Sequence, residues 1–185
     1  LAFWGMADLI LWFRQKAIRN LGYSALLFIT QLVLLVAFPF VDHAWWNRHR
    51  LTDKAAWRIS ASVYPQLAGR MIDNDPQTFW ATPQRMQAGD MIYLDFGQTI
   101  RLEELRFNHG DYAEISFPRE VRCYTLSHPG ARPQRIRNIR SGRQNHIWRL
   151  WFRDLTCRYL IVRVAEPERG QWIVYELDAF GFPLP

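Results

Sequence analysis

Residues 157–164 have the sequence CRYLIVRV, and the pattern of side chains in this stretch decides the fold class. Successive side chains of an extended strand point to opposite faces, so a period of two gathers the aliphatic side chains on one face. These side chains belong to Leu160, Val162 and Val164. The other face is amphipathic, and the stretch is therefore typical of a strand with one side in a protein core.

Short runs rich in β-branched and aromatic residues recur after residue 54: MIYLDF (91–96), TIRLEELRF (99–107), EVRCYTLS (120–127), HIWRLWF (146–152) and QWIVYELDAFG (171–181). Clusters of Gly, Pro, Asn, Asp and Ser separate these runs, as in antiparallel sandwiches. The sequence therefore predicts an all-β domain with two facing sheets over residues 55–185. A hydrophobic content of 49%, with nine Trp and twelve Phe, excludes a disordered chain.

The N-terminal part has a different pattern, because no charged residue occurs between Arg19 and Asp42. As a helix, this stretch would be about 33 Å long, which is enough to cross a bilayer. Its few polar residues form no stripe, unlike those of an amphipathic core helix, and no small-x-small cleavage site follows it, unlike a signal peptide. We therefore predict one transmembrane α-helix over residues 21–41.

Residues 1–20 begin with the apolar run LAFWGMADLILWF, which is too short to span a membrane alone. They are either an N-terminal interfacial amphipathic helix or the end of a preceding membrane helix. Residues 42–54 would then form a juxtamembrane linker. Within this linker, Trp45 and Trp46 fit an aromatic belt at the membrane interface.

Several pieces of residues 55–182 occur in the order of one known family: MIDNDPQTFW (71–80), MIYLDFGQTIRLEELRF (91–107), FPREVRCYTLS (117–127), RYLIVRV (158–164) and IVYELDAFG (173–181). Together these pieces resemble the discoidin domain, also called the coagulation-factor type C domain. That family has a galactose-binding-like fold. The resemblance therefore implies a discoidin-like jelly-roll β-sandwich.

Lysine and arginine residues lie on both sides of the predicted span, so their distribution alone assigns no orientation. They are Arg14, Lys16 and Arg19 before the span, and Arg48, Arg50, Lys54 and Arg58 after it. The first cluster is tighter, and a strand-rich domain follows the second. With the resemblance, this favours a single-pass protein of a bacterial-type inner (cytoplasmic) membrane, with its C-terminal domain periplasmic or extracellular.

Many bacterial members of the family hold a calcium ion between the first loop and the last strand. Carried over position by position, the resemblance implies the following ligands: Asp73, Asp75, Thr78 and Glu176. Calcium accepts such a mixed set of oxygen donors. The alternative is that Asp73 caps a turn and Glu176 faces solvent or pairs with an arginine.

Ligand-binding members of the family use loops at one end of the sandwich, where an aromatic ring stacks on a sugar and polar side chains bind its hydroxyl groups. The matching positions here are Arg85, Asn108, His109, Asp111 and Tyr112. The alternative assigns Tyr112 to the framework and His109 to a solvated turn.

The stretch HPGARPQRIRNIRSGRQN (128–145) departs from the family pattern and carries a basic loop: Arg132, Arg135, Arg137, Arg140 and Arg143. Such a loop is suited to an anionic polysaccharide, to lipid head groups or to an acidic partner, and the alternative is a solvated loop without a ligand. The net charge of +6 does not by itself indicate nucleic-acid binding, because no nucleic-acid readout fold is present.

Cys123 and Cys157 each fall in a predicted strand and are candidates for a disulfide, with buried free thiols as the alternative. The sequence contains no Gly-rich phosphate loop, G-x-S-x-G elbow or H-E-x-x-H motif, so we expect no catalysis within these residues. An enzymatic role would require the chain to be the C-terminal piece of a membrane glycosyltransferase.

The sequence thus predicts a membrane-anchored, extracytoplasmic recognition module that binds a glycan or an anionic envelope polymer. The alternative is a non-catalytic accessory subunit, whose span and Trp-rich segment pack on the other subunits of a larger membrane complex. Calcium is the one cofactor that the resemblance implies. The predicted partners are the lipid bilayer, the glycan and other membrane-protein subunits.

Overall fold

The computed structural model describes residues 31, 49–110 and 115–184. The chain divides into two compact units, Leu1–Arg48 and His49–Pro185, and every strand among the described residues lies in the second. The residues of this unit that the structure describes form two 3-10 helices and ten strands, in this order: η1 (Lys54–Ala56), β1 (Arg58–Ala61), η2 (Pro65–Met71), β2 (Trp80–Ala81), β3 (Met91–Asn108), β4 (Ile115–Ser116), β5 (Glu120–Leu126), β6 (Gln134–Arg135), β7 (Ile139–Gln144), β8 (Ile147–Glu166), β9 (Gln171–Val174) and β10 (Glu176–Pro183).

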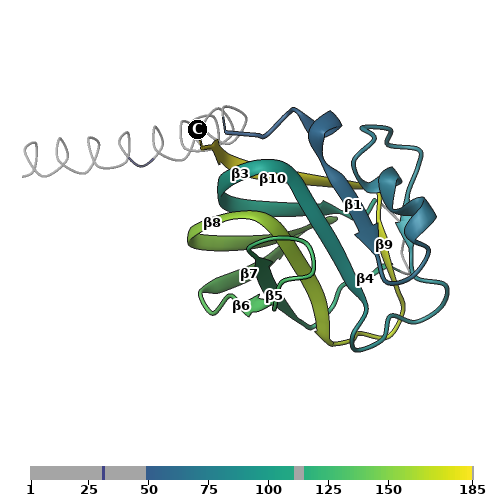
Figure 1. The fold of residues 1–185 in the computed structure, drawn as a ribbon. Helices are drawn as coiled ribbons and strands as arrows, with labels where there is room; N and C mark the ends of the chain where they lie inside the picture. The colour runs from purple at the N-terminus through teal and green to yellow at the C-terminus, as the bar shows by residue number, and fades with distance from the viewer. Residues whose placement is uncertain (1–30, 32–48, 111–114, 185) are drawn as a thin grey trace, which may run out of the picture. The chain divides into compact units, whose positions relative to one another are not determined.

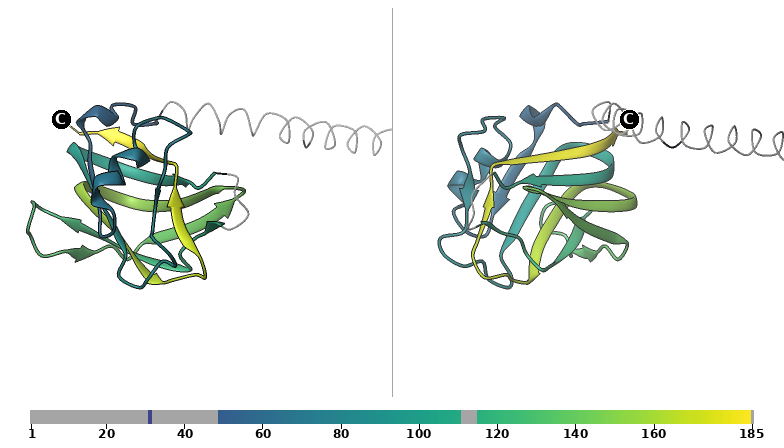
Figure 2. Two further views of the ribbon diagram at one scale, coloured as in Figure 1. Left: turned by 90° about the vertical axis from the view of Figure 1, so that its right-hand side faces the viewer. Right: turned by 180° about the vertical axis from the view of Figure 1, so that it is seen from behind.

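Strands β3 and β8 form a long antiparallel pair that curves through the domain (Figures 1 and 2). Residues 91–95 of β3 pair with 159–163 of β8, and after a break in register residues 100–108 pair with 147–157. The first half of the pair is flanked by β1 and β5, with β6 beyond β5. The second half is flanked by β10 and β7. The two halves thereby supply both layers of a β-sandwich, and β2, β9 and β4 form a separate small sheet.

The register break in β3 is built around Gly97 and Asp95. Gly97 has φ of 76°, and a Cβ atom there would lie 2.6 Å from the carbonyl oxygen of Ala56. The Oδ1 atom of Asp95 accepts hydrogen bonds from the Gly97 amide at 2.9 Å and from Nε of Arg158 at 2.8 Å. Burial opposes ionisation of this carboxyl group, but these hydrogen bonds and the Arg158 charge hold the pKa of Asp95 below its usual range.

The core contains side chains of both halves of the pair and of the small sheet. Trp80 is fully buried, packs edge-to-face on Trp172 and donates its Nε1 hydrogen to the carbonyl oxygen of Val63 at 2.9 Å. Such a satisfied indole stabilises a core strongly, because it combines a large apolar area with a partner for its one polar group. The predicted inward face of β8 is also confirmed by three buried side chains: Leu160, Val162 and Val164.

The structure differs from the sequence prediction in how the chain is divided. The predicted strands 91–96 and 99–107 are one bent strand, β3, and the predicted strands 146–152 and 157–164 are one strand, β8. Residues 49–54, predicted as part of a linker, pack on β10, where the Leu51 amide donates to the Ala179 carbonyl oxygen at 2.9 Å. The predicted basic loop contains β6 and β7.

The predicted interfacial segment 1–20 and the predicted span 21–41 lie outside the described residues, except for Gln31. Within the described part of the chain, no helix has the length and apolar character needed to cross a bilayer.

We expect Gly97→Ala to lower the free energy of unfolding by about 3 kcal/mol or more, because alanine adds both backbone strain and a clash with Ala56. Gly130 is the matched control, since it has φ of 84° but no atom within 4 Å of a Cβ. Gly130→Ala should cost only about 1–2 kcal/mol from the backbone. Urea unfolding measures both, and equal losses would contradict the clash.

Candidate functional site

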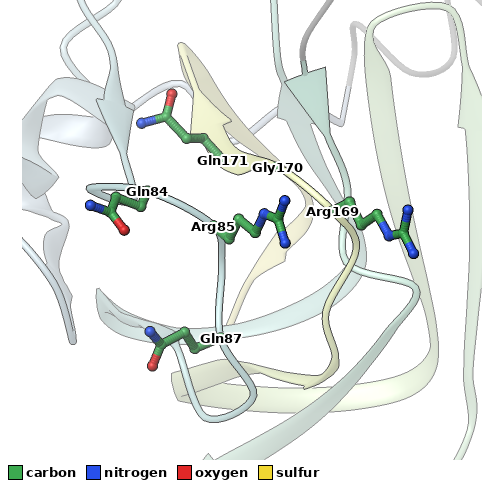
Figure 3. Close-up of a pocket in the computed structure, with 6 residues that line it drawn as sticks. All are labelled: Gln84, Arg85, Gln87, Arg169, Gly170 and Gln171. Carbon is green, nitrogen blue, oxygen red and sulfur yellow. The ribbon is translucent and has the colours of Figure 1, made fainter.

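An open cleft of about 900 Å³ lies between the β2–β3 loop and the β8–β9 loop (Figure 3). Its lining consists of three glutamines, two arginines and one glycine: Gln84, Gln87, Gln171, Arg85, Arg169 and Gly170. Arg85 is one of the ligand-binding residues expected from the sequence. Arg169 and the glutamines were not predicted, because the β8–β9 loop carries no motif that distinguishes it.

Backbone hydrogen bonds hold the two loops together. The Met86 amide donates to the Gly170 carbonyl oxygen at 2.8 Å, and the Trp172 amide donates to Oγ1 of Thr82 at 3.0 Å. The carboxamide of Gln171 also donates to the Thr82 carbonyl oxygen at 2.9 Å. The cleft is therefore formed before any ligand arrives, which lowers the entropic cost of binding.

The far end of the β2–β3 loop is fixed to β8 in the same way. The Gly89 amide donates to the Val164 carbonyl oxygen at 2.9 Å, and the Val164 amide donates to the Asp90 carbonyl oxygen at 2.8 Å. Met86 is buried beneath the loop, next to Arg85 in the sequence. Arg85 is thus an exposed side chain on a loop that is anchored on both sides.

The side chains of the cleft supply hydrogen-bond donors and positive charge. Arg85 makes no ion pair with any described residue, and Glu168, which precedes Arg169 in the sequence, is paired with Arg119 at 2.9 Å. In Figure 3 the two guanidinium groups extend to one side and the three carboxamides to the other. The lining includes no carboxylate, thiol, hydroxyl or imidazole side chain. Such a lining recognises hydroxyl or anionic groups, but it supplies no nucleophile or general base.

His109 differs from the prediction, because it is fully buried and cannot touch a surface ligand. Its ring lies 4.2 Å from that of Phe117 and 6.4 Å from that of Phe107, measured between ring centroids. Burial lowers the pKa of His109 to about 3, so the imidazole is neutral at pH 7.

Asn108 lies in a second cleft of about 660 Å³ and therefore not beside Arg85. Its Oδ1 atom accepts a hydrogen bond from the Gly110 amide at 3.0 Å. The structure thus separates these two predicted ligand-binding residues. The other two, Asp111 and Tyr112, lie outside the described residues.

Three of the predicted calcium ligands form a self-contained loop. Asp73 accepts hydrogen bonds from the Asp75 amide at 3.0 Å and from Oγ1 of Thr78 at 2.7 Å. Asp75 in turn accepts one from the Gln77 amide at 2.9 Å. The loop therefore satisfies its own carboxylates, as the alternative of a capped turn expects.

The fourth predicted ligand, Glu176, forms an ion pair with Lys54. Lys54 is only 5% exposed, and its ammonium group also lies 2.7 Å from Oδ1 of Asp178. Arg50 donates to the same oxygen at 2.7 Å. Burial raises the pKa of Glu176, with further contributions from the charges of Asp178 and Asp73, while Lys54 opposes the rise.

This arrangement does not fit the predicted calcium site. Calcium requires six to eight oxygen donors around one point. Here a buried ammonium group already lies on the Glu176 carboxylate, and the described residues contain no cluster of three or more His, Cys, Asp or Glu side chains that could hold a metal. The positive charge at this place is supplied by the chain itself.

The two cysteines are buried free thiols, so the disulfide predicted as one alternative is absent. Cys123 of β5 is paired with Val162 of β8, whereas Cys157 is five residues away along β8. At roughly 3.3 Å per residue this separation exceeds the reach of a disulfide. Burial raises the pKa of both thiols to about 12.

The arginines of the predicted basic loop are all exposed at the surface: Arg132, Arg135, Arg137, Arg140 and Arg143. Arg143 donates to the Pro118 carbonyl oxygen at 3.2 Å and lies over the Phe117 ring. The other four make no ion pair with a described residue, and two of them line a groove that is separate from the cleft at Arg85.

Comparison with solved structures finds carbohydrate-binding modules of the same fold. The family 32 module of Clostridium perfringens NanJ, solved with galactose, is 11% identical and has a TM-score of 0.57, and the match covers 71% of this chain and 98% of that one. A module of a C. perfringens protein, CpGH89CBM32-5, solved with GalNAc-β-1,3-galactose, is 17% identical with a TM-score of 0.57, at coverages of 71% and 99%.

The C-terminal domain of a Bacteroides fragilis chitobiase is also similar, at 17% identity and a TM-score of 0.57, with 74% of this chain and 99% of that one covered. At these identities the likeness establishes the fold, a discoidin-like galactose-binding sandwich. No protein-family model matches the sequence, and no curated protein matches it.

We expect the thermal midpoint of unfolding to be the same in excess calcium as in excess chelator, because a ligand raises stability only when it binds the native state. Lys54→Met should lower the free energy of unfolding by about 1–3 kcal/mol, since it leaves the partly buried Glu176 charge without its partner. Adding Glu176→Gln to Lys54→Met should restore part of that loss. A calcium-dependent rise in the midpoint of the unmutated protein would contradict this assignment.

Proposed function

We propose that residues 49–185 form a non-catalytic glycan-binding module whose ligand occupies the cleft at Arg85 and Arg169. The observation that carries this proposal is the cleft itself. Two arginines and three glutamines line it, and backbone hydrogen bonds hold together the loops that form it. The fold supports it, since similar domains were solved with galactose and with GalNAc-β-1,3-galactose.

The side chains of the cleft favour a sugar that offers several oxygen acceptors. Guanidinium groups donate paired hydrogen bonds to carboxylates, and carboxamides both donate to and accept from hydroxyl groups. Arginine and glutamine side chains do not act as nucleophiles on a glycosidic bond. Hydrolysis by the usual route needs two carboxyl groups, one on each side of that bond, and the cleft lining contains none. The ligand is therefore bound and released unchanged.

We expect Arg85→Ala to weaken glycan binding about tenfold or more, because it removes a charge-assisted hydrogen bond worth about 1.5–3 kcal/mol. A glycan array with the purified chain identifies the sugar, and isothermal titration measures its affinity. Arg70→Ala is the matched control, since Arg70 is an exposed arginine on η2, outside the cleft. Equal weakening by both substitutions, or no binding to any glycan, would overturn the proposal.

We also propose that residues 21–41 tether this module to a membrane, with the module on the extracytoplasmic side. The support is the uncharged sequence between Arg19 and Asp42, followed by the aromatic pair Trp45 and Trp46. A tether would hold the module near envelope glycans and raise its effective concentration there.

Cell fractionation tests the tether. We expect the chain in the membrane fraction, resistant to extraction by high salt and released by detergent, and a variant without residues 1–48 in the fraction without membranes. Protease added to spheroplasts should degrade residues 49–185, which would place them outside the cytoplasm. Extraction of the chain by high salt would contradict the tether. Protection of residues 49–185 from the added protease would contradict its orientation.

A further inference from the structure

A groove of about 540 Å³ runs along β7 and the adjoining bend of β8. It is separate from the cleft at Arg85 and shares no lining residue with it. Its lining consists of three arginines and one indole ring, with smaller contributions from the start of β7 and from β8: Arg137, Arg140, Arg153, Trp151, Asn138, Ile139 and Phe152.

The positive charge of this groove is only weakly neutralised by the described residues. Arg137 and Arg140 are exposed and make no ion pair with them, whereas Arg153 makes one long ion pair, at 3.8 Å to Asp154, in which the two side chains are 86% and 76% exposed and therefore strongly screened by solvent. Arginines elsewhere in the domain are tightly paired, such as Arg158 with Asp95 at 2.8 Å. Three guanidinium groups around one groove therefore create a local positive potential that attracts anions.

Trp151 gives the groove a fixed flat wall. It is the direct cross-strand partner of Arg140, so both side chains lie on the same face of the sheet. Its ring lies against Gly142, where a Cβ atom would be 2.8 Å from Cη2 and Cζ3 of the indole. The absence of a side chain at Gly142 therefore lets the half-exposed ring lie on the backbone of β7.

We propose that this groove binds an acidic polysaccharide whose sugars carry carboxylate or sulfate groups. The guanidinium groups of Arg137, Arg140 and Arg153 would form bidentate hydrogen bonds to these anions. The indole of Trp151 would pack against the apolar face of a sugar ring. The groove places positive charge beside an aromatic ring. This arrangement matches a polymer whose sugar rings carry anionic groups.

The surroundings of the groove favour a polysaccharide over a lipid surface. Peripheral membrane binding combines basic residues with apolar side chains that enter the bilayer. The exposed large apolar side chains of the described residues lie elsewhere, on none of β6, β7 or β8: Tyr64, Phe79, Met91, Phe182 and Leu184. Trp151 is only partly exposed, and its ring lies against Gly142 of β7.

The test uses the full 185-residue chain in detergent with heparin and polygalacturonate as probes and dextran as the neutral control. We expect the double variant Arg137→Ala/Arg140→Ala to bind both polyanions at least about tenfold more weakly. The double variant Arg132→Ala/Arg135→Ala is the matched control, because it removes the same charge from exposed residues outside the groove. It should keep most of the affinity.

Two further variants separate the contributions. Trp151→Ala should weaken polygalacturonate binding without changing the net charge, with a thermal midpoint measured to confirm folding. Arg85→Ala should leave polyanion binding unchanged, so that failure of this groove and failure of the proposed glycan cleft are distinguishable.

Several results would overturn the proposal. They are equal losses in the two double variants, no binding to either polyanion, or tighter binding to single-stranded DNA or to anionic phosphatidylglycerol vesicles than to the polysaccharides. Loss of affinity in the Arg85→Ala variant would assign the anion to the other cleft instead.

Discussion

The antiparallel pairing of β3 and β8 is the constraint on which the rest of the domain depends. The pairing changes register midway, so this one strand pair contributes to both layers of the sandwich. Strands β1 and β10 pair with β3, and strands β5 and β7 pair with β8. The change in direction is stabilised locally, because Asp95 accepts hydrogen bonds from Gly97 and Arg158 at the point where regular pairing stops. A side chain at Gly97 would displace η1 from this bend.

Both proposed binding surfaces derive their rigidity from that strand pair. The cleft at Arg85 lies where the chain enters β3 and leaves β8, and hydrogen bonds between the Gly89–Asp90 segment and Val164 continue the pairing into the loop. The groove at Arg140 lies on the opposite half of β8, where β7 pairs with it through six residues. In both places the backbone next to the site is already held by hydrogen bonds, which lowers the entropic cost of ordering it on binding.

The local sequence pattern predicted which residues form strands. It could not predict features that depend on contacts between residues far apart in the sequence. The alternation in residues 157–164 predicts the buried face of β8, because side-chain direction in a strand depends only on position. In contrast, His109 reads as a loop residue beside Gly110, and its burial depends on Phe117 and on the pairing of β4 with β9. The sequence did not indicate Arg169 either, because Arg169 becomes part of a site only where the β2–β3 loop lies opposite it across the cleft.

The ion pair between Lys54 and Glu176 is a contact that neither the sequence pattern nor the family resemblance predicts. The two residues are 122 positions apart, and no local pattern indicates that a lysine reaches the start of β10. Once there, its single charge balances acidic groups that would otherwise attract a cation, and Arg50 neutralises Asp178 beside it. A bound metal ion exchanges with solvent, whereas a lysine side chain cannot leave. The same contacts hold residues 50–54 on β10, so charge fixes the segment that precedes β1 against the last described strand.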